Sequence, residues 1–120
     1  MATDIARMET TLGELRAQLR DGLLVSTVWD RATGLALVGY NSNDAAVALL
    51  THIVEQFDEH LAMAGMPLLS RFAFLELQHN RAGLVVLHGK TLLHGILVDT
   101  SKTNIGVLMA VVLPKMLSGA

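Results

Sequence analysis

The sequence predicts an α/β domain of the α+β kind, in which a five-stranded antiparallel sheet has one helix on one face and two on the other. Three stretches show helical periodicity, and five short runs are apolar and strand-like. The last three runs are separated by connections too short for a crossover helix, which indicates antiparallel neighbours. A chain of 120 residues has a single-domain length, so we treat 1–120 as one domain.

The first predicted element is a helix with one narrow apolar stripe, because apolar residues recur at spacings of three and four. Thr3 is its expected N-cap and Gly22 its expected end. We expect it to lie on the domain's own sheet, since two heptads are too few for a coiled coil with a partner. The stripe consists of Ile5, Met8, Leu12, Leu15 and Leu19.

Two strands should follow as a hairpin. Leu23–Asp30 is rich in β-branched and aromatic residues, and Leu35–Tyr40 is a second short apolar run. The segment between them ends in Gly34, which suits a backbone conformation with positive φ.

The central element is a long helix over Asn43–Ala64, with Asn43 as N-cap and Gly65 and Pro67 as the stop. Its apolar arc spans roughly 160°, whereas a helix resting on one surface needs only about 100°. We therefore expect something besides its own sheet to cover part of it. The predicted sheet-facing residues are Ala46, Leu50, Ile53, Phe57 and Leu61, and the arc is widened by Val47, Leu49 and Val54.

Three strands and a last helix complete the prediction. The strands are Arg71–Gln78, Gly83–His88 and Leu92–Asp99, of which the first carries charge and is the most edge-like. Consecutive apolar residues in the first, fourth and fifth strands indicate that both sheet faces are covered. The helix begins at Asn104 and runs to Leu117, with Pro114 expected to kink or loosen its last turn.

This element order resembles the Roadblock / dynein light chain family, including its bacterial members that regulate Ras-like GTPases. The run LLVSTVWDRATGLALVGY is similar to that family's opening hairpin, and Asn104–Leu108 is similar to the start of its closing helix. The resemblance implies a homodimer with a small GTPase as partner. It also implies a sheet with Arg71–Gln78 at one edge and Leu35–Tyr40 at the other, and with the central helix alone on its face.

Composition narrows the class of protein. Hydrophobic residues make up 52% of the chain and charged residues 17%, against a usual charged fraction of about 25%. This surplus of apolar side chains favours self-association. A net charge of -2 without any Lys/Arg run argues against nucleic-acid binding. We expect a cytoplasmic protein without a membrane span, because the start of the chain lacks a signal-peptide pattern and no apolar run reaches about 20 residues.

No residue pattern indicates an enzyme, a cofactor or a metal site. The Gly89–Thr91 segment lacks the preceding glycine of a phosphate loop and is interpreted as a hairpin turn. His52 and His60 are eight residues apart on the central helix, which suits a solvated face rather than a metal pair. His88 and His94 lie in neighbouring strands as buried, hydrogen-bonded residues or as a pH-sensitive pair.

Two functions from different classes remain open. The first is a non-enzymatic homodimeric interaction module that binds a Ras-like GTPase. The second is a small-molecule sensor of PAS, GAF or profilin-like architecture, which would need a pocket with convergent polar groups. For the first, the predicted dimer interface consists of Val47, Leu50, Val54, Leu61, Phe72, Phe74 and Glu76, and the predicted partner-binding surface of Thr51, His52, Glu55, Asp58 and Glu59.

Overall fold

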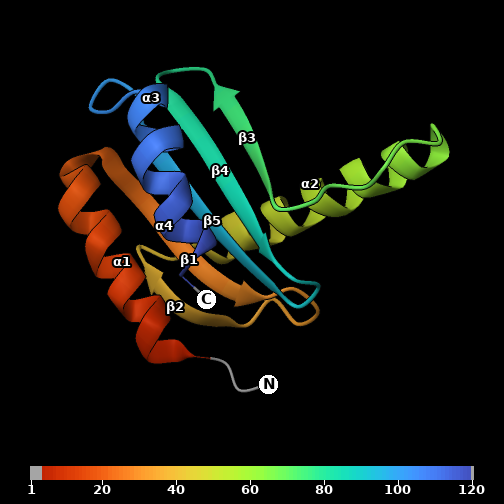
Figure 1. Ribbon diagram of the computed structural model, residues 1–120, viewed down its shortest axis with the longest axis horizontal. Coiled ribbons are helices and arrows are strands. Elements are labelled where there is room, and N and C mark those ends of the chain that lie inside the picture. The colour runs from red at the N-terminus through yellow and green to blue at the C-terminus, as the bar shows by residue number, and fades with distance from the viewer. Residues whose placement is uncertain (1–3, 120) are drawn as a thin grey trace.

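The computed structural model describes residues 4–119, and its element order is the predicted one (Figure 1). Every predicted strand is present, and the predicted ends differ from the observed ones by two residues at most. The elements are α1 (Ile5–Leu19) with a short 3-10 turn (Arg20–Gly22), β1 (Leu23–Asp30), β2 (Ala36–Tyr40), α2 (Asp44–Met63), β3 (Phe72–Leu77), β4 (Arg81–His88), β5 (Leu92–Asp99), α3 (Ile105–Val107), a π-helical turn (Leu108–Val112) and α4 (Leu113–Leu117).

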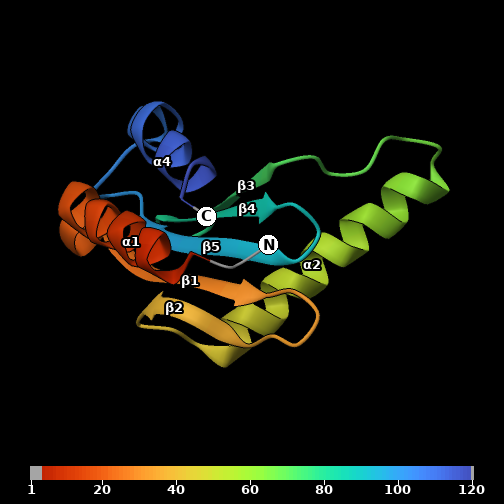
Figure 2. The ribbon, with the colours of Figure 1, turned by 60° about the horizontal axis from the view of Figure 1, so that its bottom comes forward.

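The strands form one antiparallel sheet in the order β2-β1-β5-β4-β3, so β2 and β3 are its edges as predicted. Figure 2 shows α1 and α4 on one side of the sheet and α2 on the other. The middle strands are buried at consecutive positions, Ala82 to Leu87 in β4 for example. The prediction that helices cover both faces is therefore confirmed.

Polar side chains fix the ends of the elements. Asn43 accepts hydrogen bonds from the N–H groups of Ala45 and Ala46 (2.9 and 3.3 Å), as expected of the α2 N-cap. In the β1–β2 turn, the Asp30 carboxylate accepts from the Thr33 N–H (3.0 Å) and Gly34 adopts a φ of 73°.

The start of α1 differs from the prediction. The predicted cap Thr3 lies outside the described residues. Within them the N-cap is Asp4, whose carboxylate accepts from the Arg7 N–H at 2.9 Å.

Each sheet face has its own core. On one face, Leu15 of α1 and Val112 and Met116 of the C-terminal helix pack with Leu84 and Val86 of β4. On the other, Trp29, Val47, Val54, Val85, Leu87 and Leu93 form a smaller cluster beneath α2. The face covered by α2 is therefore the less completely filled of the two.

The C-terminal helix accommodates Pro114 through a π-helical turn, Leu108–Val112, that directly precedes α4. A proline has no N–H to give to the carbonyl four residues earlier. In the turn just before it, the Leu113 N–H instead bonds to the Leu108 carbonyl five residues back, as in a π-helix. Of the two predicted effects of Pro114, a kink or a loosened turn, the structure has the second, as a π-helical turn inside a continuous helical segment.

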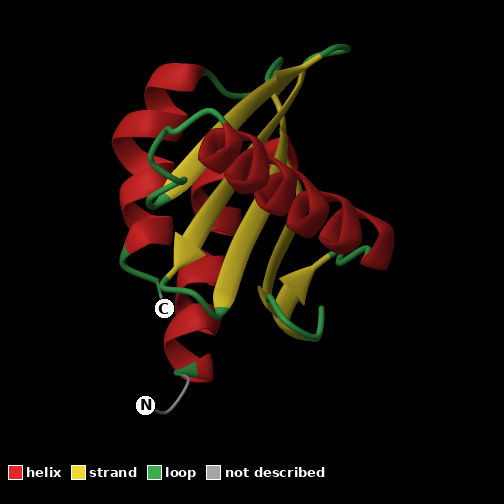
Figure 3. Ribbon diagram, turned by 90° about the vertical axis from the view of Figure 1, so that its right-hand side faces the viewer, coloured by secondary structure: helices red, strands yellow, loops and turns green. Residues whose placement is uncertain are grey.

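Helix α2 crosses the sheet with its first half and then projects beyond it (Figures 1 and 3). Its buried side chains are Val47 and Val54, and no residue from Glu55 to Met63 is buried. The projecting half still carries Phe57 and Met63, which are 40% and 76% exposed. Half of an amphipathic helix therefore has no sheet beneath it within the described chain.

Candidate functional site

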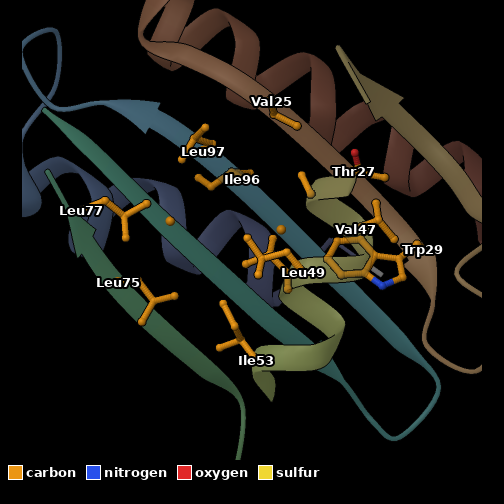
Figure 4. A pocket seen from close by; sticks show the side chains of 14 residues that line it. Val25, Thr27, Trp29, Val47, Leu49, Ile53, Leu75, Leu77, Ile96 and Leu97 are labelled. Carbon is orange, nitrogen blue, oxygen red and sulfur yellow. The ribbon is translucent and has the colours of Figure 1, made fainter. Parts of the chain in front are cut away.

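An apolar groove of about 230 Å³ lies on the α2 face of the sheet, beside the first half of α2 (Figure 4). Leu49 and Ile53 come from α2, and Leu75 and Leu77 come from the edge strand β3. The other lining residues come from α2 and from strands β1, β4 and β5: Val25, Thr27, Trp29, Ala46, Val47, Leu50, Gly83, Gly95, Ile96 and Leu97.

Glycine in the sheet lets α2 approach closely at one end of the groove. A Cβ atom at Gly95 would lie 2.8 Å from Leu50 Cδ1 and 3.0 Å from the Trp29 ring. The Trp29 indole N–H donates to the Thr51 hydroxyl at 2.9 Å, which ties α2 to β1. Helix α2 is therefore held over β1 and β5, and the sheet surface towards β3 stays uncovered.

Burial corrects the predicted interface on α2. Val47 and Val54 are only 6% and 0% exposed because they pack on the protomer's own sheet, so they have no surface to offer a partner. Leu50 and Leu61 are half-buried, and Leu50 lines the groove. The residue that α2 leaves open beside the groove is Leu49, which is 57% exposed.

The edge strand β3 has two different faces. Phe74 packs against the core shared with α4. Phe72 (38% exposed) and Glu76, two residues before and after it, lie on the same face of the strand. Leu75 and Leu77 point to the other face and line the groove. The predicted interface residues of β3, which are Phe72, Phe74 and Glu76, therefore lie on the face of the strand that points away from α2.

The predicted partner-binding residues divide into two groups. Thr51 is partly buried and, besides accepting from Trp29, donates to the Val47 carbonyl at 2.8 Å. Asp58 accepts from the Leu69 N–H at 2.9 Å and thereby anchors the segment that follows α2. The prediction that these two are exposed is therefore wrong, whereas His52, Glu55 and Glu59 do lie exposed on α2.

The exposed surface of α2 is acidic. The chain has no Lys or Arg between Arg31 and Arg71. Arg31 itself lies 3.9 Å from Glu55 and 3.7 Å from Asp58, so one guanidinium partly neutralises two carboxylates. Such partly exposed pairs contribute little to stability, on the order of 1 kcal/mol or less. Glu59 forms no ion pair among the described residues, and α2 therefore offers net negative charge.

The other face of the sheet holds the two strand histidines. His94 is buried between Val28 and Val86 of the neighbouring strands, and its Nε2 lies 3.0 Å from the Ser26 hydroxyl. Burial, together with the charge of nearby His88, lowers the pKa of His94 to about 3. Burial and then the charge of Arg7 lower the pKa of His88. His94 is thus a neutral core residue, the first of the two predicted alternatives.

This burial predicts a loss of stability in acid. The unfolded chain takes up a proton near pH 6.5 whereas folded His94 does not, so the free energy of unfolding falls as the pH falls below 6.5 towards 3. Between pH 7 and pH 5 the loss due to His94 should be about 2 kcal/mol. Denaturant unfolding of His94→Leu should lack that part of the slope.

As a control for that measurement, Ile96→Val shortens a neighbouring core side chain without removing a titrating group. It should lower stability by about 1 kcal/mol at every pH and keep the slope. An unchanged slope in His94→Leu would contradict the assignment.

Within residues 4–119, no three His, Asp or Glu side chains gather in a way that could hold a metal ion. The Gly89–Thr91 segment is the β4–β5 hairpin turn, as predicted, and Gly89 has a φ of 63°. No helix in this part of the chain combines the length and the apolar character that crossing a membrane requires.

The architecture is that of a Roadblock-type domain. Similar solved structures are MglB of Myxococcus xanthus, with a TM-score of 0.78 at 10% identity over 99% of this chain and 88% of that one, and an MglB in a tetrameric arrangement, with 0.71 at 15% over 94% and 86%. A third is a Roadblock/LC7 domain from Streptomyces avermitilis, with a TM-score of 0.59 at 13% identity over 97% and 92%. No model of a protein family and no curated protein matches the sequence.

Proposed function

We propose that this chain is a non-enzymatic homodimeric module that binds a Ras-like small GTPase. The observation that carries the proposal is that one protomer has both an open apolar groove and a half of α2 that projects beyond the sheet. Both are large apolar features of one protomer, and they occur on the side of the sheet that α2 occupies (Figure 2).

A second copy of the chain would cover both features at once. In a twofold dimer the same patch on each subunit contacts the other, so an apolar projection on one subunit can meet the groove of its partner. The projecting half of α2 and the segment after it supply Phe57, Met63, Met66 and Leu68, all at least 40% exposed. Monomeric proteins rarely leave so many large apolar side chains together in solvent.

The free edge of β3 adds a directional element. Strand β3 pairs only with β4, so its outer N–H and C=O groups have no strand partner within the described chain. An exposed apolar edge strand promotes aggregation unless it is covered. Antiparallel pairing of β3 with its twofold copy would bring the two grooves and the two α2 helices together. Such an interface should bury on the order of 1,200–2,000 Å² in total.

The GTPase part of the proposal rests on the resemblance to the Roadblock family and on the acidic face of α2. In the proposed dimer two such helices lie side by side, which would concentrate the charge of Glu55 and Glu59 on one surface. Complementary charge across an interface speeds encounter and selects among partners. The expected partner surface is therefore basic.

The sensor alternative receives no support from the groove. A small-molecule site needs a few convergent polar groups to orient its ligand. The only polar side chain in the lining is Thr27, whose hydroxyl is 3.0 Å from the Ser42 hydroxyl, and the Trp29 N–H is already bonded. The groove suits apolar side chains of a protein better than a metabolite.

A capture experiment tests the GTPase part. Immobilised protein is mixed with purified Ras-like GTPases of the same organism, loaded with GDP or with a GTP analogue. Glu55→Lys with Glu59→Lys should weaken capture by about ten-fold, because it replaces attraction to a basic partner with repulsion. The midpoint of thermal unfolding should stay nearly the same, since exposed charges add little to stability.

The matched control reverses two charges on the opposite face of the molecule. Glu9→Lys with Glu14→Lys changes the net charge equally on α1 and should leave capture unchanged. Equal capture by wild type and the α2 variant, or no capture of any GTPase in either nucleotide state, would contradict this part of the proposal.

A further inference from the structure

A second candidate surface lies on the opposite side of the molecule from α2, where α1 runs along the edge strand β2. A groove of about 530 Å³ is lined there by Gly13, Arg16, Ala17, Arg20, Asp21 and Tyr40. The proposed dimer and GTPase surfaces use α2 and β3, so this groove belongs to neither.

Two arginines of this groove have no ion-pair partner in the part of the chain that the structure describes. Arg16 lies on the exposed side of α1 and Arg20 directly follows the end of that helix, and within residues 4–119 neither forms an ion pair. The Arg16 guanidinium lies 4.2 Å from the centre of the Tyr40 ring, which fixes its position over the end of β2. The acid of the groove, Asp21, is already paired with Lys102 at 3.0 Å.

The backbone at Arg20 is held in an unusual conformation. Its φ is 53° and its ψ is −127°, a region that a residue with a side chain seldom occupies. Such strain is often found where a side chain has to be held in a particular place. Here it occurs where α1 ends, at the guanidinium that borders the groove.

Next to the arginines lies a free sheet edge. Strand β2 pairs only with β1, and within the described residues no loop or side chain bonds to the backbone of Ala36–Tyr40 from outside the sheet. Alternate residues of an antiparallel edge strand turn both their N–H and C=O groups outward. These groups can pair with an added extended peptide, a common mode of peptide recognition.

We propose that the β2 edge and the α1 groove together bind an extended acidic peptide of a partner protein. The peptide pairs with β2 through its backbone and adds a sixth strand to the five-stranded sheet. Its alternate side chains then point towards α1, where carboxylates meet Arg16 and Arg20. A partner segment with an acidic residue at every second position fits this surface.

The test uses the full chain and fluorescent peptides of about eight residues, a usual strand length. The probes are a peptide alternating Glu and Val, a peptide alternating Lys and Val, and the first peptide with a central proline. Fluorescence anisotropy should show binding of the Glu/Val peptide alone, because the second has the wrong charge and proline cannot complete a strand. Equal binding of the proline peptide would overturn strand pairing.

Two variants locate the site. Arg16→Glu with Arg20→Glu should weaken the Glu/Val peptide by at least about ten-fold, whereas Arg7→Glu with Lys90→Glu makes the same change of net charge elsewhere and should not. Gly13→Leu adds a side chain where nothing lies within 4 Å of its Cβ, so the fold is retained while the groove is filled. It should also weaken the peptide.

The surface assignment is overturned if neither variant affects peptide binding, or if inorganic phosphate alone displaces the peptide completely, since a simple anion site would then suffice. It is also overturned if Arg16→Glu with Arg20→Glu changes the mass of the particle in solution, because the edge would then serve a second copy of the chain. Loss of GTPase capture in the α2 variants has no bearing on these outcomes, so the two proposals fail separately.

Discussion

Replacement of Val54 by glutamate is expected to unfold the protein. Val54 is completely buried between α2 and the sheet, in the cluster with Trp29 and Val85. An unpaired carboxylate there would lose its hydration without gaining a partner, at a cost of several kcal/mol. A small domain is stable by only about 5–15 kcal/mol, so most of its stability would be lost.

Circular dichroism of Val54→Glu should show loss of helix and no cooperative unfolding transition. Val54→Ala removes apolar volume at the same site without adding charge and should keep a cooperative transition, destabilised by about 2 kcal/mol. Leu49→Glu, on the exposed side of the same helix, should keep the native spectrum. A native spectrum for Val54→Glu would mean that α2 is rotated relative to the structure described above.

The double variant Leu49→Glu with Leu77→Glu is expected to give a folded monomer. These residues line the groove from α2 and from β3, and they are 57% and 48% exposed in the protomer. In the proposed dimer four carboxylates would enter one apolar interface. The dissociation constant should rise at least about 100-fold, equivalent to about 2.7 kcal/mol.

The control for that variant places glutamate at two other exposed apolar residues. Leu35 and Ile105 are 65% and 57% exposed and lie outside the groove, so Leu35→Glu with Ile105→Glu should leave the oligomeric state unchanged. Light scattering separates the outcomes, and circular dichroism checks the fold of each variant. If the control variant also dissociates, added negative charge at any exposed apolar position breaks the dimer, and the effect of the first variant does not locate the interface.

Local chemistry made the architecture predictable. Asn43 and Asn104 both cap helices as the sequence indicates, and the Asp30–Gly34 turn forms through the expected positive φ at glycine. Buried consecutive positions in β4 and β5 followed from their continuous apolar runs. These features depend on residues close together in the chain, so the sequence alone is enough to predict them.

The site depended on contacts between distant segments and was predicted less well. The apolar arc of α2 is wide enough to accept several rotations about its axis, and the close approach of Leu50 to Gly95 decides which of them occurs. A glycine in β5 opposite a long helix was the available signal. A similar ambiguity affected β3, because both of its faces carry large apolar residues, Phe72 and Phe74 on one and Leu75 and Leu77 on the other.

Homodimerisation is tested by the mass of the wild-type particle in solution. Multi-angle light scattering during size-exclusion chromatography, at micromolar concentration, should give twice the 12.9 kDa mass of the chain. The Leu49→Glu, Leu77→Glu variant should give one chain mass with an unchanged circular dichroism spectrum. A wild-type particle of one chain mass throughout the micromolar range would contradict the proposed homodimer, because the groove and the projecting half of α2 would then stay exposed.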